Sequence, residues 1–264
     1  MTQLVLSLFP GIGLLDMAFE AEGFCVVRGP DTLWGGDIRR FHPPAGKFDG
    51  VIGGPPCQAF SKLRHIVLAK GQTLRPNLIP EFERVITATQ PQWFLMENVP
   101  DAPEPSIHNY ITRSYQLNNR WFGAEQNRER RFSFGALLPE FLTEMPPLVF
   151  DFAALEHVNY ERAVVATSSK EGALAKSQQE LACGTSPRMA AMKRRRTLPG
   201  QQPRRTIARC AELQGLPKDF LVDAPFTAAG KYEVVGNGVP LPMGRAVARA
   251  VRRALGLDDA KAQT

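Results

Sequence analysis

Cysteine is scarce in this 264-residue sequence, and its four cysteines lie far apart. They are Cys25, Cys57, Cys183 and Cys210. No Cys-x-x-Cys pair is present, and no histidine lies at metal-ligand spacing from a cysteine. A disulfide framework needs paired cysteines and a structural zinc site needs clustered ligands, so we expect neither. The sequence therefore predicts a protein without a bound metal.

Long apolar runs are also missing, since no run approaches the roughly 18 residues that a membrane-spanning helix requires. The N-terminus lacks the basic region, apolar core and cleavage site of a secretion signal. We therefore expect a cytoplasmic protein with no membrane partner. The chain is long enough to bury a sizeable core, and its hydrophobic fraction of 44% is ordinary for a soluble globular protein.

Acidic residues are absent between Leu181 and Ala211, although the net charge of the whole chain is only +6. This stretch holds eight of the 32 basic residues, which leaves 24 basic against 26 acidic residues elsewhere. The eight are Arg188, Lys193, Arg194, Arg195, Arg196, Arg204, Arg205 and Arg209. Concentrated positive charge favours binding to phosphate backbones, with an affinity that falls as salt rises. A solvated turn is the plainer alternative for Lys193–Arg196.

Strand-like and helix-like patterns alternate in the first half of the chain. Strands are expected at Leu4–Phe9, Cys25–Val27, Val51–Ile52 and Trp93–Met96, and helices at Leu14–Glu22 and Arg84–Thr89. The alternation is typical of a doubly wound α/β fold with a mostly parallel sheet. Two later strands, Tyr115–Leu117 and Arg131–Phe134, are expected to close the sheet as an antiparallel pair. Helical spacing returns at Ala208–Leu213 and Arg245–Leu255.

The segment Val51–Ser61 reads VIGGPPCQAFS and places one cysteine just after a short apolar strand. The Gly-Gly and Pro-Pro pairs end that strand, because proline cannot continue a hydrogen-bonded ladder. Cys57 then lies in a stiff corner at the edge of the sheet. A buried structural cysteine is the commoner state of a free thiol. The surrounding Gly-Gly-Pro-Pro and Gln58 favour an active-site loop.

This loop resembles the catalytic loop of the cytosine-5 DNA methyltransferases, and other motifs of that family occur in the family's order. They are Phe9–Gly13 (FPGIG), Glu97–Val99 (ENV), Gln126–Arg130 (QNRER), Arg205–Pro217 and Gly236–Pro240 (GNGVP). The resemblance implies a Rossmann-like methyltransferase fold, S-adenosylmethionine as cofactor and double-stranded DNA as partner. It also implies a prokaryotic or phage-infected cell as the setting, and we expect a monomer.

The resemblance implies that the Cys57 thiolate adds to carbon 6 of cytosine and so activates carbon 5 toward the methyl group. Glu97 is expected to act at ring nitrogen 3, Arg128 at the carbonyl oxygen, and Arg130 as a buttress for them. No histidine lies near these motifs, so the base that removes the carbon 5 proton is not identified.

Further residues are assigned to DNA. A duplex hides the target ring, so the base must be flipped out of the stack, with Gln58 and Ser61 contacting phosphate or filling the gap. The basic residues Lys193, Arg194, Arg195 and Arg196 are expected to bind the duplex. We divide the chain into a catalytic and cofactor-binding α/β domain (1–137), a small irregular target-recognition region (138–203) and a C-terminal segment that packs back on the first domain (204–264).

The resemblance also implies a cofactor site. Its expected residues are Phe9, Gly11, Ile12, Gly13, Asp31, Asp37, Ile38, Pro55, Asn237 and Val239. Glycines let the backbone approach a ligand closely at the end of a strand. Asp31 is expected at the ribose hydroxyls and Asp37 at the adenine amine, while Asn237 is expected in a tight turn. A turn-forming role for Asp31 and a helix cap for Asp37 are the structural alternatives.

Three other functions remain open. Enzymes that methylate amino groups carry an aromatic residue after Pro-Pro, where this chain has Cys57. Transfer RNA cytosine methyltransferases share the core motifs and differ mainly in substrate. A non-catalytic DNA-binding relative would be marked by loss of Cys57 or Glu97, and both are present.

Overall fold

The computed structural model describes residues 2–56, 60, 76–137, 147–153, 160–164 and 205–258. The chain forms two compact units, the first made of Met1–Ala163 and Gly238–Thr264, the second of Val164–Asn237. Some of the predicted site residues lie outside the described residues, namely Cys57, Gln58, Ser61 and Lys193–Arg196. The domain boundaries at 137 and 203 stay predictions.

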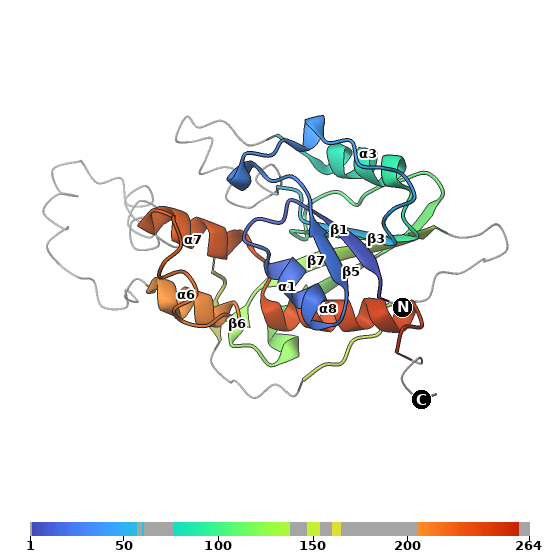
Figure 1. Ribbon diagram of the computed structural model, residues 1–264. Helices are drawn as coiled ribbons and strands as arrows, with labels where there is room; N and C mark the ends of the chain where they lie inside the picture. The colour runs from blue at the N-terminus through green and yellow to red at the C-terminus, as the bar shows by residue number, and fades with distance from the viewer. Residues whose placement is uncertain are drawn as a thin grey trace, which may run out of the picture. The chain divides into compact units, whose positions relative to one another are not determined.

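The first unit is built on a six-stranded sheet with the order β2-β1-β3-β4-β7-β5 (Figure 1). The strands are β1 (Leu4–Leu8), β2 (Cys25–Arg28), β3 (Gly50–Gly53), β4 (Trp93–Asn98), β5 (Tyr110–Asn118) and β7 (Glu129–Leu137). The first four in spatial order are parallel, and β7 runs antiparallel to both β4 and β5. The predicted doubly wound, mostly parallel sheet and its antiparallel closing pair are confirmed.

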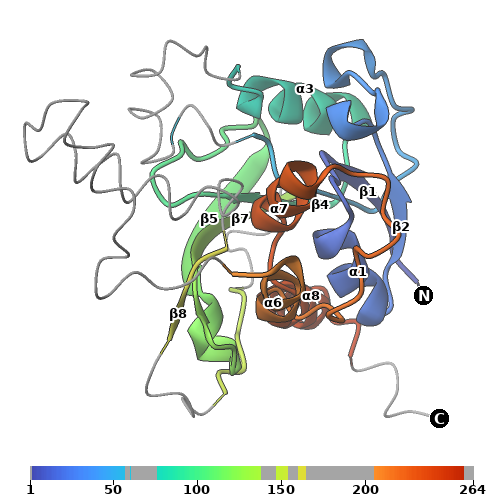
Figure 2. The same cartoon turned by 90° about the vertical axis from the view of Figure 1, so that its left-hand side faces the viewer.

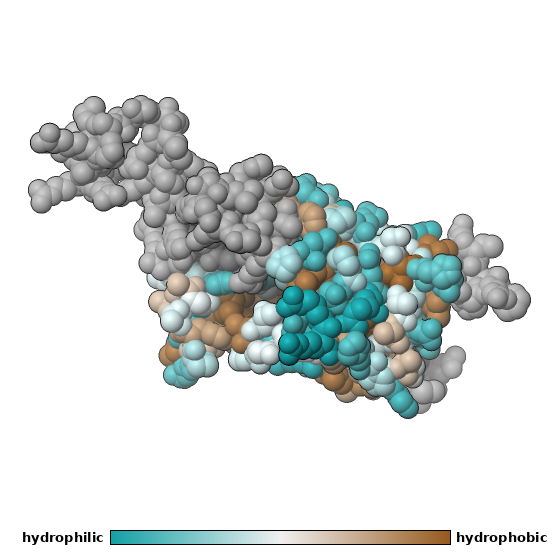
Figure 3. Space-filling view, turned by 90° about the horizontal axis from the view of Figure 1, so that it is seen from above, coloured by the Kyte–Doolittle hydropathy of each residue, from teal (hydrophilic) through white to brown (hydrophobic). Residues whose placement is uncertain are grey.

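Helices cover both faces of this sheet (Figures 1 and 2). One face packs against α1 (Leu14–Ala21) and α8 (Leu241–Ala254), and the other against α3 (Ile79–Thr89). The outer side of α3 is half-exposed or exposed, and hydrophilic side chains gather over the middle of the face seen from above (Figure 3). This amphipathic arrangement is what a helix on the face of a sheet requires.

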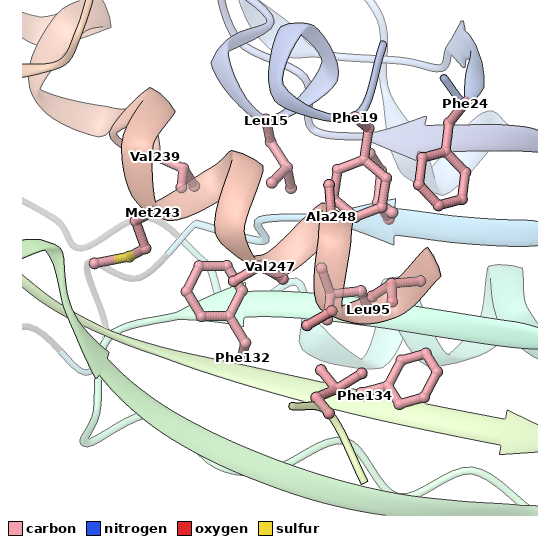
Figure 4. Packing of buried hydrophobic residues seen from close by; sticks show 14 of the residues in the cluster. Leu15, Phe19, Phe24, Leu95, Phe132, Phe134, Val239, Met243, Val247 and Ala248 are labelled. Atoms are coloured by element: carbon pink, nitrogen blue, oxygen red, sulfur yellow. The ribbon is translucent and has the colours of Figure 1, made fainter. Parts of the chain in front are cut away.

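Two apolar clusters form the core because side chains alternate across each strand. Val5 of β1 joins the cluster under α1 and α8, whereas Leu6 and Leu8 join the cluster under α3. Figure 4 shows Met243 and Val247 of α8 directed toward the sheet beside Phe132. The sheet is thus anchored by a helix from the far end of the chain.

The second unit contributes two described helices, α6 (Ile207–Leu213) and α7 (Ala228–Asn237). In this unit the Gln214 side chain donates to the carbonyl of Val235 at 2.6 Å, and the Tyr232 hydroxyl donates to the carbonyl of Arg205 at 2.7 Å. The tight turn predicted around Asn237 is wrong, because this residue ends α7. The helix, with Val234 and Val235 buried, continues through Gly236 despite the glycine. A small ladder in the first unit pairs β6 (Gln126–Asn127) with β8 (Glu161–Arg162).

Aromatic rings on β4 lie directly over glycines of the neighbouring strands. Trp93 is paired in register with Gly50 of β3, and Phe94 with Gly135 of β7. A Cβ atom at either glycine would overlap the facing ring. Successive residues of β4 therefore lock the sheet register on its two faces.

Replacing Gly135 with Ala should lower the free energy of unfolding by about 1–3 kcal/mol, the usual cost of overpacking a core. Urea denaturation measures the change. Gly230→Ala in α7 is the matched control, because its Cβ would meet no atom closer than 3.3 Å and alanine favours a helix. Equal stability of Gly135→Ala and the wild type would show that the ring contact does not constrain the sheet.

Candidate functional site

The turn Phe9–Gly13 joins β1 to α1 at the carboxyl end of the central strands. Its backbone is left-handed at three positions, with φ of 57° at Phe9, 57° at Gly11 and 83° at Gly13. For Phe9 this is a strained conformation of the kind that gathers at functional sites. A Cβ at Gly11 would meet no described heavy atom within 4 Å. The turn therefore leaves room for a ligand to approach the backbone closely at Gly11.

Asp31 closes this turn from the side of β2. Its Oδ2 accepts from the amide of Gly11 at 2.9 Å, and its Oδ1 accepts from the amide of Leu33 at 2.7 Å. The second bond caps a short 3-10 turn, Thr32–Trp34. The turn-forming role considered for Asp31 is thus present in the structure, while its contact with ribose stays a prediction.

Trp34 was missed by the sequence reasoning. Its indole Nε1 donates to the carbonyl of Gly11 at 2.8 Å, and its side chain is 60% exposed. Asp31 and Trp34 therefore hold the two backbone polar groups of Gly11 from the same 3-10 turn. An aromatic residue between Asp31 and the Gly35-Gly36 pair was the sequence signal for it.

Asp37 caps a second 3-10 turn, Ile38–Arg40, by accepting from the amide of Arg39 at 3.0 Å. The Arg39 guanidinium donates twice to the same carboxylate, at 2.9 Å each, and these bonds hold the pKa of Asp37 below its ordinary value. Two short 3-10 turns thus follow β2, and each is capped by one of the two acids. Ile38 is buried, and adenine recognition by this pair stays a prediction.

Glu97 lies near the carboxyl end of β4 and is only 7% exposed. Its Oε1 forms an ion pair with Arg130 Nε of β7 at 2.7 Å. A Cβ at Gly54 would lie 3.0 Å from the other carboxylate oxygen. The Glu97 carboxylate therefore lies against the backbone that leads from β3 toward Cys57, and a glycine there lets the two come together.

Asn98 fixes that same backbone. Its Nδ2 donates to the carbonyl of Pro55 at 3.2 Å, and its Oδ1 accepts from the amide of Val99 at 2.9 Å. Both Asn98 and Pro55 are buried. The ENV segment thus supplies one side chain that carries charge and a neighbour that positions the Pro-Pro loop.

The two motif arginines differ in their protein contacts, while their contacts with the base stay predictions. Arg128 is 1% exposed, and its Nη2 donates to the carbonyl of Gly238 at 3.0 Å. Arg130, expected to be the buttress, is the one beside Glu97. Arg128 therefore joins the sheet to the segment before α8, and sequence spacing alone could not separate the two residues. Val239 is buried in the core cluster with α8, and Asn237 is exposed.

Arg131 holds the chain that follows Asn98. It donates to the carbonyls of Pro100 and Ala102. The sequence reasoning gave it no role. Within the described ranges no three metal-ligating side chains gather, and no helix there has the length and apolarity to cross a membrane.

A family model described as C-5 cytosine-specific DNA methylase matches residues 33–182, which is more than half of the chain. The chain belongs to the C-5 cytosine-specific DNA methylase family. It is 34% identical to the Type II methyltransferase M.NgoPII of Neisseria gonorrhoeae over 149 residues, 48% of this chain and 38% of that protein. It is 26% identical to the Type II methyltransferase M.NlaX of Neisseria lactamica over 95% of this chain and 96% of that protein.

Solved structures show the same fold. The Entamoeba histolytica methyltransferase EhMeth matches with a TM-score of 0.59 at 14% identity, covering 97% of this chain and 99% of that one. A putative DNA modification methyltransferase encoded within a prophage of E. coli matches with a TM-score of 0.55 at 17% identity, covering 97% and 100%. The chain spans about half or less of the first curated relatives it matches, between 38% and 51% of their length.

Proposed function

We propose that this chain transfers a methyl group from S-adenosylmethionine to carbon 5 of cytosine in double-stranded DNA, through a covalent adduct with Cys57. The observation that carries the proposal is the ion pair between Glu97 and Arg130, placed against the Gly54–Pro55 backbone that leads into the Cys57 loop. Membership in the C-5 cytosine-specific methylase family and similarity to Type II methyltransferases support it.

Each group has a role that follows from its chemistry. The Cys57 thiolate forms a bond to carbon 6, and the electron pair of the ring double bond becomes available at carbon 5. Negative charge develops at nitrogen 3 and at the carbonyl oxygen. The Glu97 carboxyl, protonated when the base enters, gives its proton to nitrogen 3 and takes it back when Cys57 leaves, while the Arg130 guanidinium supplies positive charge near the oxygen. This proposal gives Arg130 the role that sequence reasoning gave to Arg128.

The reaction is completed at carbon 5. When bound, the cofactor would supply an electrophilic methyl group from its sulfonium and would be left as the neutral thioether S-adenosylhomocysteine. Carbon 5 takes this methyl, loses its proton to a base, and the electron pair of that C–H bond re-forms the ring double bond as Cys57 leaves carbon 6 as a thiolate. Asn98 would hold the carbonyl of Pro55, and with it the approach of the loop, throughout these steps.

The cofactor would lie on the open turn at Gly11. Asp31 and Trp34 fix that turn, and the exposed indole of Trp34 offers a flat surface on which an adenine can stack. Asp37 and Ile38 would contact the adenine edge. Phe9, Ile12, Gly13, Pro55 and Val239 complete the proposed set within the first unit, and a contact of Asn237 with the cofactor stays a prediction from sequence.

The proposal is tested by bisulfite sequencing of DNA from cells that express the full chain. Wild type should protect cytosines at a defined target, and Cys57→Ser should not, because a hydroxyl has too high a pKa to add to the ring. Cys25→Ser is the matched control, because Cys25 is an exposed cysteine on β2. Wild-type methylation by Cys57→Ser would refute the covalent mechanism.

The alternative RNA substrate requires its own assay. Purified protein is offered duplex DNA and transfer RNA with a labelled methyl donor. Transfer to DNA supports the proposal, and transfer only to transfer RNA would replace the substrate while keeping the chemistry.

The two arginines can be separated by substitution with Met. Arg130→Met should lower turnover about 100-fold to 1,000-fold, the usual loss when a group that stabilises transition-state charge is removed. Arg128→Met should act mainly on the free energy of unfolding, lowering it by about 1–3 kcal/mol, because the substitution removes a fully buried guanidinium and its hydrogen bond. Labelled-methyl kinetics and urea denaturation measure both. If Arg128→Met lost more turnover per folded molecule than Arg130→Met, Arg128 would be the residue that acts at the carbonyl oxygen, as predicted from sequence.

DNA binding by the basic cluster is tested through its salt dependence. Replacing Lys193, Arg194, Arg195 and Arg196 by Ala should reduce the slope of log affinity against log salt, by about 0.9 for each phosphate that the protein no longer neutralises. Fluorescence anisotropy with duplexes of several sequences measures it, and affinity for S-adenosylhomocysteine should not change. An unaltered slope would show that the cluster is a solvated turn.

A further inference from the structure

A buried polar cluster lies directly beneath the glycine turn, where β1, α1 and β2 meet. Its centre is Asp16, which is 0% exposed. Asp16 Oδ1 accepts from the Ser7 hydroxyl at 2.5 Å, and Oδ2 accepts from Arg28 Nε at 3.0 Å. Ser7 lies on β1 and Arg28 on β2, so one carboxylate joins all three elements that carry the turn.

Burial of the Asp16 carboxylate costs free energy, because a charged group loses its hydration in the protein interior. Burial raises the pKa of Asp16, while the hydrogen bond from Ser7 and the charge of Arg28 oppose the rise. The Ser7 hydroxyl and the Arg28 guanidinium are thus the two groups that hold this carboxylate in the interior.

Arg28 connects the cluster to the ligand-facing backbone. A Cβ at Gly13 would lie 2.8 Å from Arg28 Nη2 and 3.0 Å from its Cζ. The guanidinium thus packs against Gly13, whose φ of 83° already requires glycine. The Arg28 side chain remains 53% exposed, and its ion pair with the fully buried Asp16 ties it to the interior.

A second carboxylate provides the contrast. Glu22 follows the last turn of α1 and forms ion pairs with Arg245 at 2.8 Å and Arg249 at 3.0 Å. These contacts join α1 to α8, far along the helix from the glycine turn. Glu22 is therefore a structural anchor of the same helix.

We propose that Asp16 is a positioning residue that holds Arg28 against Gly13 and thereby keeps the glycine turn in the shape that binds S-adenosylmethionine. The inference rests on the proposed function, because it assumes the cofactor. It adds a residue that makes no contact with the cofactor and acts through Arg28. Ser7 fixes the other oxygen of the carboxylate and so orients it.

The test is calorimetric titration of the purified full chain with S-adenosylhomocysteine, well below the unfolding temperature. Asp16→Asn and Arg28→Met should each weaken binding about tenfold or more, the size expected when one charge-assisted hydrogen bond is removed. The double variant should bind no more weakly than the weaker single variant, because both changes break one interaction. Methyl-transfer kinetics should show a raised KM for the cofactor with kcat kept at saturation.

Glu22→Gln is the matched control and should leave binding within about twofold while lowering the unfolding temperature, because its ion pairs act on helix packing alone. Equal weakening by Glu22→Gln would overturn the inference, since any loosening of α1 would then suffice. Should Asp16→Asn fail to fold, Arg28→Met decides, because it changes a half-exposed side chain. If Arg28→Met bound S-adenosylhomocysteine with wild-type affinity, the inference would be overturned while the proposed function would stand. Absence of binding by the wild type would overturn the proposed function and the inference with it.

Discussion

The parallel pairing of β3 with β4, with Gly53 opposite Met96, is the constraint on which the candidate site depends. Because parallel strands end at the same edge of a sheet, the next residues of each strand become neighbours. Gly54 and Pro55 therefore emerge beside Glu97 and Asn98. The ion pair with Arg130 and the bond from Asn98 to Pro55 are consequences of this register.

Two kinds of contact support that register: the packing of aromatic rings over glycines, and a hydrogen bond that joins the sheet to the C-terminal part of the chain. Trp93 and Phe94 fill the space left by glycines on β3 and β7, so a slip of either strand would place a ring against a side chain. Arg128 joins the start of β7 to the carbonyl of Gly238, and α8 follows directly to cover the sheet. The C-terminal part of the chain thus stabilises a site built mostly from the N-terminal part.

The strands and their α/β order could be predicted from sequence because apolar runs and Gly-Pro interruptions are local signals. The strand at Trp93–Asn98 is one example, since its apolar residues run straight into the ENV motif. Contacts between residues that lie far apart in the sequence cannot be predicted from such local signals. Which of Arg128 and Arg130 lies beside Glu97 depends on where each side chain points after the chain crosses from β6 to β7. The side chains of Asp31 and Trp34 form hydrogen bonds with the backbone of Gly11, and no sequence spacing encodes these bonds.

The central claim is that Cys57 adds to carbon 6 of a cytosine before methyl transfer. A duplex with 5-fluorocytosine at the target tests this most directly, because fluorine replaces the proton that must leave carbon 5 and the adduct cannot break down. The account predicts a DNA-linked protein that survives denaturation, forms only with S-adenosylmethionine, and maps by mass spectrometry to the peptide containing Cys57. Full methylation activity on ordinary duplex without any trapped species, or an adduct at another residue, would contradict it.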